Sequence, residues 1–191
     1  MTAKGERTRE SIIDASYALF AKKGFKQVTM KDVCDVTNMS RGGLYSHFSS
    51  TSQLFEALLE KMTERSETDI QEATGKGASA LSILVESFAS LEEETGHPED
   101  SLSIAMLEYA QTVDAHVMEQ LNRIGAEKWK KLIRYGIKRG EFKAVDVDEI
   151  VNLILYSYQG VRMWSMVSPM KPEVYHSITE NIKRQLIGET R

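Results

Sequence analysis

The segment from Val28 to Phe48 constrains the fold of this chain more than any other stretch. It reads V-T-M-K-D-V-C-D-V-T-N-M-S-R-G-G-L-Y-S-H-F. Thr29 followed three residues later by Asp32 fits a capping box at a helix start, and Ser40 can cap a second helix. Asn38 lies between the two, and Asn adopts the left-handed backbone conformation more readily than most residues. The segment therefore predicts two short helices joined by a tight turn.

Apolar residues give each of these helices an inner face. Val33 and Val36 are three residues apart, and Leu44 and Phe48 are four apart, so each pair shares one side of its helix. The outer face of the second helix then carries Arg41, Gly42, Gly43, Tyr45, Ser46 and His47. Small residues let a backbone approach base edges in the DNA major groove, while polar groups reach bases and phosphates. For any single residue an ordinary solvated position is the better interpretation, but the whole arrangement favours DNA reading.

The span from Arg9 to Leu59 resembles the DNA-binding domain of the TetR family of transcriptional regulators. The matching residues are Ile12-Ile13-Asp14-Ala15-Ser16, Leu19-Phe20, Gly24-Phe25, Thr29-Met30-Lys31-Asp32-Val33 and Ser40-Arg41-Gly42-Gly43-Leu44-Tyr45-Ser46-His47-Phe48. Their order and spacing make the match specific. The resemblance implies an all-α homodimer of about nine helices per chain. A three-helix DNA-binding domain with a helix-turn-helix, residues 6–66, would precede an all-helical ligand-binding and dimerisation domain, residues 67–191.

The resemblance also implies which residues meet DNA. Arg41 is the residue best suited to sequence readout, because Arg pairs bidentately with guanine. Where this chain has Thr51 the family usually has Lys, so we expect weaker phosphate binding at this position, although a helix N-terminus still attracts phosphate. The expected DNA-binding residues are Thr29, Lys31, Ser40, Arg41, Gly42, Gly43, Tyr45, Ser46, His47, Ser50 and Thr51.

The distribution of charge agrees with a DNA-binding N-terminal region. The whole chain has a formal charge of −4. Residues 1–50 hold eight Lys or Arg and five Asp or Glu, a charge of +3, whereas residues 51–191 hold sixteen and twenty-three, a charge of −7. Phosphate attraction acts locally, over a Debye length of about 8–10 Å, so the sign near the contact matters more than the total.

Helical periodicity continues along the rest of the chain. Helices are expected over residues 7–23, ending at Gly24, and from a Ser50–Gln53 capping box to about residue 73. Further helices are expected over 81–91, 102–109, 117–135, 150–164 after an Asp146 cap, and 172–187. The N-terminal arm is expected to be flexible. Contact with DNA phosphates and a tail without any role are equally favoured interpretations of it. Apolar residues occupy more than one stripe of the last two helices, which indicates a homodimer interface, with filling inside one subunit as the alternative.

The resemblance implies a small-molecule effector, apolar or aromatic, bound in the C-terminal domain. The expected lining residues are Phe88, Met106, Tyr109, Trp129, Tyr156, Gln159, Met163 and Trp164, with Arg162 as a second polar anchor. Each alone is more often plain core or interface. Repression relieved by the effector is the family's common mode, and activation and corepression stay open.

Two other classes of protein are alternatives to a DNA-binding regulator. Against an enzyme, the four histidines are scattered, Cys34 is expected to be a buried structural thiol, and no phosphate-binding glycine loop or H-E-x-x-H motif occurs. No catalytic residue, metal or cofactor is therefore expected. A helical interaction module that has lost DNA binding is the other alternative, supported by Thr51. The single cysteine, the absence of an apolar run of about 20 residues and the lack of a secretory signal indicate a cytoplasmic protein.

Overall fold

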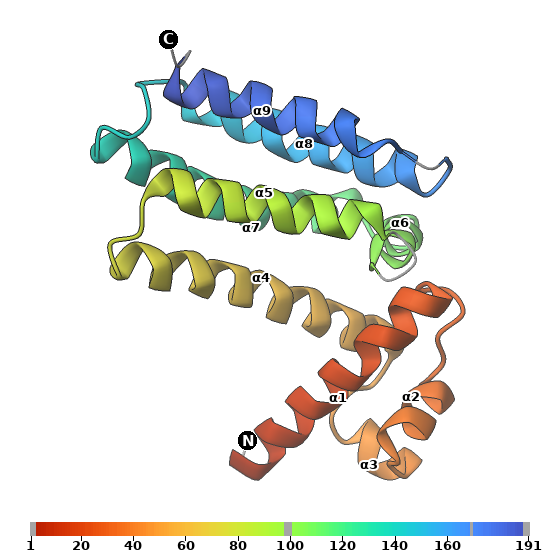
Figure 1. Ribbon diagram of the computed structural model, residues 1–191. Coiled ribbons are helices and arrows are strands. Elements are labelled where there is room, and N and C mark those ends of the chain that lie inside the picture. The colour runs from red at the N-terminus through yellow and green to blue at the C-terminus, as the bar shows by residue number, and fades with distance from the viewer. Residues whose placement is uncertain (1–2, 98–100, 169, 189–191) are drawn as a thin grey trace. The chain divides into compact units, whose positions relative to one another are not determined.

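The chain folds into helices alone throughout the residues that the computed structural model describes, 3–97, 101–168 and 170–188 (Figure 1). In chain order the helices are α1 (Ala3–Lys23), α2 (Met30–Thr37), α3 (Arg41–Tyr45), α4 (Thr51–Gly75), α5 (Ala80–Gly96), α6 (Ser103–Ala110), α7 (Ala115–Lys138), α8 (Val147–Ser165) and α9 (Pro172–Ile187). The expected all-α class is confirmed.

The helices group into two compact units. The first, which we call the head, contains the described residues within 1–64 and 99–114; the second, the body, contains those within 65–98 and 115–191. Helix α4 contributes residues to both units, and α6 belongs to the head although it follows α5 in the chain.

An aromatic cluster forms the core of the head. The ring of Phe55 from α4 lies with its centroid 4.7 Å from that of Phe20 in α1 and 5.3 Å from that of Phe25. Tyr109 of α6 completes the cluster, with ring centroids 5.1 Å from Phe25 and 5.2 Å from Phe55. Aromatic contacts at these separations stabilise a core beyond their area of burial, so they explain why α6 packs on α1.

The body is a bundle in which α7 packs against α5 and α8, and α9 packs against α5 and α8 (Figure 1). The buried Phe88 and Trp129 rings lie 5.8 Å apart at its centre. Helix α7 has a glycine, Gly136, where the ring of Phe142 crosses it, and a Cβ there would collide with that ring. The close approach allows the chain after α7 to fold back onto the helix.

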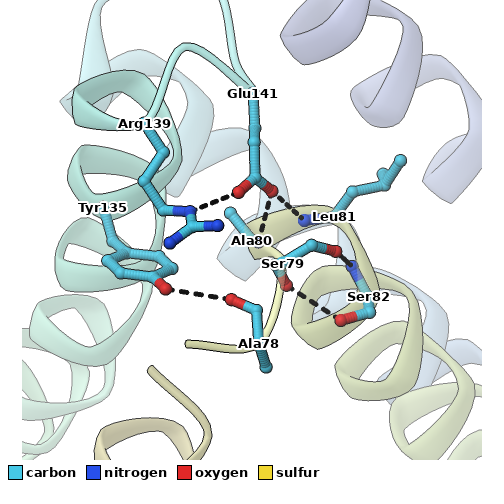
Figure 2. Close-up of polar contacts among 8 residues, drawn as sticks. All are labelled: Ala78, Ser79, Ala80, Leu81, Ser82, Tyr135, Arg139 and Glu141. Atoms are coloured by element: carbon cyan, nitrogen blue, oxygen red, sulfur yellow. Dashed lines mark hydrogen bonds and ion pairs between the residues drawn. The ribbon is translucent and has the colours of Figure 1, made fainter. Parts of the chain in front are cut away.

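The start of α5 is fastened to the end of α7 by a set of polar contacts (Figure 2). One carboxylate oxygen of Glu141 accepts hydrogen bonds from the Ala80 N–H at 2.6 Å and, more weakly, from the Leu81 N–H at 3.4 Å. The other oxygen pairs with Arg139, which holds the pKa of Glu141 below its usual range. The Tyr135 hydroxyl donates to the Ala78 carbonyl at 2.9 Å.

Several local expectations are wrong in detail. Helix α1 begins at Ala3, so the N-terminal arm is helical where a flexible segment was expected. Val36 is 43% exposed, because the buried side of α2 is formed by Val33 and Cys34. Apolar side chains on two further helices, Met62 on α4 and Val85 on α5, are also 40% and 46% exposed. The buried Cys34 thiol is confirmed.

Candidate nucleic-acid interface

The start of α2 is held by a reciprocal capping box. Thr29 Oγ1 accepts from the Asp32 N–H at 3.2 Å, and Asp32 Oδ2 accepts from the Thr29 N–H at 2.8 Å. Thr29 has an extended backbone, φ −114° and ψ 158°, as an N-cap residue requires. The predicted capping box is therefore confirmed, and it orients the first turn of α2.

The same aspartate joins α2 to α1. Lys23 Nζ lies 2.7 Å from Asp32 Oδ1. This contact with Lys23, together with the hydrogen bonds from Thr29, holds the pKa of Asp32 well below its usual range. Since the carboxylate accepts from the cap of its own helix and from the neighbouring helix, it fixes the orientation of α2 against α1.

The turn between α2 and α3 has the predicted left-handed residue. Asn38 has φ 56° and ψ 30°, and the next N–H, that of Met39, donates to the Cys34 carbonyl at 3.1 Å. Ser40 then caps α3 by accepting from the Gly43 N–H at 3.2 Å. A cap, a left-handed turn and a second cap therefore fix the direction of α3, as the sequence predicts.

Helix α3 is shorter than expected. It ends at Tyr45, so Ser46 and His47 follow the helix and do not lie on its outer face. The His47 N–H donates to the Leu44 carbonyl at 2.9 Å, three residues back, and the Ser46 hydroxyl donates to the Gly43 carbonyl at 2.7 Å. Bonds over three residues tighten the last turn and end the helix.

The expected DNA-binding residues lie at the surface of the head. Arg41 and Lys31 are exposed, and neither side chain has a hydrogen bond or ion pair with any described residue. A Cβ added to Gly42 would meet no atom within 4 Å. Exposed positions are Thr29, Lys31, Ser40, Arg41, Gly42, Tyr45 and Ser46; half-buried positions are Gly43, His47, Ser50 and Thr51.

The start of α4 has a variant of the predicted cap. Ser50 Oγ accepts from the Gln53 N–H at 3.1 Å, as expected. The return bond is displaced by one residue, because Gln53 Oε1 accepts from the Ser49 N–H at 2.7 Å. The two bonds together satisfy groups at the helix start and place Thr51 in its first turn.

Three contacts within the head were not predicted. The guanidinium of Arg9 lies 4.1 Å from the centroid of the Phe48 ring, a cation–π contact between α1 and the segment after α3. Glu108 of α6 accepts from the Lys26 N–H at 2.8 Å, and Lys26 Nζ donates to Gln111 at 2.8 Å. The sequence holds no signal for these pairs, since their partners are 39 to 85 residues apart.

The expected effector-lining residues are divided between the head and the body. Phe88 and Trp129 contact each other in the body core, and Tyr109 lies in the aromatic core of the head. Tyr156, Met163 and Trp164 are 68%, 52% and 60% exposed on α8. Gln159 and Met106 are half-buried.

The body has a cleft elsewhere, of about 240 Å³, between the second half of α4 and α7. Among the described residues no group of three or more His, Cys, Asp or Glu could hold a metal ion. Nor is any helix in the described ranges both long and apolar enough to cross a bilayer.

Comparison with known proteins agrees with this geometry. Residues 12–58 match the family model described as bacterial regulatory proteins, tetR family. The chain is 28% identical over 148 residues to YfiR, an uncharacterised HTH-type transcriptional regulator of Bacillus subtilis, covering 73% of this chain and 70% of the relative. It is 24% identical to the HTH-type transcriptional repressor KstR2 of Mycolicibacterium smegmatis, covering 86% and 83%. Residues 12–58 form a DNA-binding domain of the TetR family.

Most of the chain shares its fold with a solved structure. The crystal structure of FadR from Bacillus subtilis in complex with stearoyl-CoA superposes with a TM-score of 0.71 at 18% identity, covering 92% of this chain and 98% of FadR. The sequence relatives are named as transcriptional regulators or repressors. With a TetR-type DNA-binding domain and relatives of this kind, the protein is a DNA-binding transcriptional regulator and not an enzyme.

Proposed function

We propose that this protein is a repressor that binds a palindromic operator as a homodimer and is released by a small molecule bound in the body. The observation that carries DNA reading is the exposed start of α3. There the Arg41 guanidinium has no partner among the described residues, and Gly42 presents bare backbone. Because Arg pairs bidentately with guanine, this corner suits base-edge contact, and the charge of +3 in residues 1–50 supports phosphate attraction.

The dimer proposal is supported by apolar surface on α8. Tyr156, Met163 and Trp164 are exposed. They lie at positions i, i+7 and i+8, which share one broad face of an α-helix. Gly160 lies between them with no atom within 4 Å of an added Cβ. A large apolar stripe beside an open glycine allows close approach of a second helix. Val174 of α9 adds to the exposed apolar residues, at 43% exposure.

The effector proposal is supported by the cleft in the body and by FadR, a structural neighbour that was solved with stearoyl-CoA. Helix α4 contributes residues to both units. We propose that a ligand favours a body conformation in which α4 is displaced, which changes the spacing of the two reading helices. Two heads on a palindrome must match half-sites about 34–36 Å apart, so a change of spacing would lower operator affinity.

The test is selection of bound sequences from a random duplex pool at near-physiological salt. We expect enrichment of a palindrome whose half-sites are about one helical turn apart. Affinity for the selected duplex should fall as salt rises, because phosphate contacts release counterions. Absence of enrichment at this and at lower salt would favour the helical interaction module and contradict the proposal.

A further inference from the structure

The cleft between α4 and α7 combines apolar wall with positive charge. Its lining residues are Ile70, Gln71 and Thr74 from α4, and Lys128, Lys131 and Tyr135 from α7. On α7 the three lie at i, i+3 and i+7, so they share one side of the helix. All six belong to the body. A site of this composition matches a small organic molecule that carries a negative charge.

Lys128 is the unusual member of this lining. Its ammonium is half-buried, donates a hydrogen bond to the Ser66 hydroxyl at 2.9 Å, and lies 5.3 Å from the centroid of the Trp129 ring. It forms no ion pair with any described residue. Burial lowers the pKa of Lys128, because a charged group loses hydration there. Holding a cation in such a place without a counter-charge costs stability.

One carboxylate, that of Glu94, acts on Lys128 electrostatically, and it already has partners. The Tyr158 hydroxyl donates to Glu94 Oε2 at 2.6 Å, and the Arg162 guanidinium lies 3.8 Å from Glu94 Oε1. Arg162 is itself only 12% exposed at its side chain. Glu94 therefore completes a pair with Arg162, and the Lys128 charge is left without a direct counter-ion.

We infer that the cleft binds a compact organic acid, with its carboxylate on Lys128 and its apolar part against Ile70 and Tyr135. Lys131 adds positive potential at the same wall. The Tyr135 ring is a fixed surface, because its hydroxyl is held by the Ala78 carbonyl and the Arg139 guanidinium lies 5.3 Å from its centroid (Figure 2). At about 240 Å³ the cleft is smaller than the roughly 300–1,000 Å³ of sites for drug-sized ligands. That the bound acid regulates DNA binding rests on the proposed function, in which this acid is the effector.

Calorimetric titration of the full chain tests the ligand class, with two acids and their neutral amides: benzoate against benzamide, and hexanoate against hexanamide. We expect saturable binding of at least one acid and affinity about tenfold or more weaker for its amide, equivalent to about 1.4 kcal/mol. Lys128→Met keeps the length of the side chain and removes its charge, and should weaken acid binding by a similar factor. Lys138→Met makes the same change on α7 outside the cleft lining, and should leave binding unchanged.

Thermal unfolding of the unliganded variants separates a ligand-binding lysine from a structural one. If Lys128 is kept for an anion, Lys128→Met should melt at or above the wild-type temperature, because a desolvated cation is removed. A clear drop in melting temperature relative to Lys138→Met would overturn the inference. So would equal affinity for acid and amide, or no saturable binding of either acid to the wild type.

Operator binding, followed by fluorescence anisotropy with the selected duplex, distinguishes this inference from the proposed function. If an acid releases DNA from the wild type but not from Lys128→Met, the result supports both the anion site and the proposed function. Acid binding through Lys128 without any effect on DNA supports the anion site and contradicts effector release. Release of DNA by a neutral compound alone, with Lys128→Met still responsive, overturns the anion site and leaves the proposed function standing.

Discussion

The Tyr109 hydroxyl donates a hydrogen bond to Glu56 Oε1 at 2.7 Å and thereby joins α6 to α4 within the head. The Tyr109 ring is fully buried against Phe25 and Phe55. Burial and the neighbouring carboxylate raise the pKa of Tyr109, so the hydroxyl stays protonated and remains a donor. The contact makes α6 part of the head's core, although body residues 65–98 precede it in the chain.

Tyr109→Phe should lower the free energy of unfolding by about 1.5–3 kcal/mol, the usual contribution of a hydrogen bond to a charged group. The ring and its packing remain, so only the bond is removed. Tyr45→Phe is the matched control, because the Tyr45 side chain is 52% exposed. Urea unfolding of both variants measures the difference, and equal stability would show that the bond contributes nothing net.

The stability of the head should depend on pH through Asp32. Its pKa is held below the ordinary value of 3.8 in the folded state by Lys23 and Thr29. The folded state therefore binds this proton less readily than the unfolded state, so the stabilisation is complete above pH 3.8 and is lost as the pH falls toward the lower folded pKa.

Asp32→Asn should lower the free energy of unfolding at pH 7. It should also make that free energy fall less steeply as the pH is lowered. Asp35→Asn, an exposed change on the same helix, should do neither. Urea unfolding at pH 7, 5 and 3 measures the slopes. Parallel slopes for Asp32→Asn and the wild type would contradict the assignment.

Arg41→Ala should relax the choice of operator. Loss of a bidentate contact to guanine costs about 1–3 kcal/mol on the selected operator and less on random DNA. Tyr45→Phe should instead weaken binding to all DNA about equally, because we propose that its hydroxyl contacts a DNA phosphate. Competition binding with operator and random duplex measures both, and equal losses for Arg41→Ala would count against base readout.

Gly42→Ala separates DNA contact from folding. The added methyl group meets no protein atom within 4 Å, and alanine favours a helix over glycine by up to about 1 kcal/mol, so stability should be kept or raised. If the backbone of α3 lies against base edges, operator affinity should fall about tenfold, or about 1.4 kcal/mol. Gly75→Ala on α4, where an added Cβ also meets nothing, is the control that should leave DNA binding unchanged.

Trp164→Arg should convert the proposed dimer to a monomer. The side chain is 60% exposed in the single chain, so an arginine there does not disturb the body core, but it places a charge in the proposed interface. Val85→Arg replaces another exposed apolar residue, 46% exposed on α5, and should leave the dimer intact. Light scattering after size exclusion gives the mass, and a dimer that survives Trp164→Arg would exclude this stripe as the interface.

The local features of the head could be read from the sequence because each depends on residues three or four apart. The Thr29–Asp32 capping box, the left-handed Asn38 and the Ser40 cap are all present in the structure. Such contacts form within one turn of backbone, so the residue types at fixed spacing determine them. The resemblance to a known family was carried by the same stretch, and it correctly supplied the all-α fold.

Only the tertiary structure decided which helices share a core and which charges lack partners. The packing of α6 into the head depends on Tyr109 meeting Phe25, Phe55 and Glu56, which lie more than fifty residues away in the chain. The position of Lys128 beside Ser66, and the pairing of Glu94 with Arg162, are likewise unreadable from spacing. Periodicity shows that a helix has an apolar side, but burial depends on what the rest of the chain places against it.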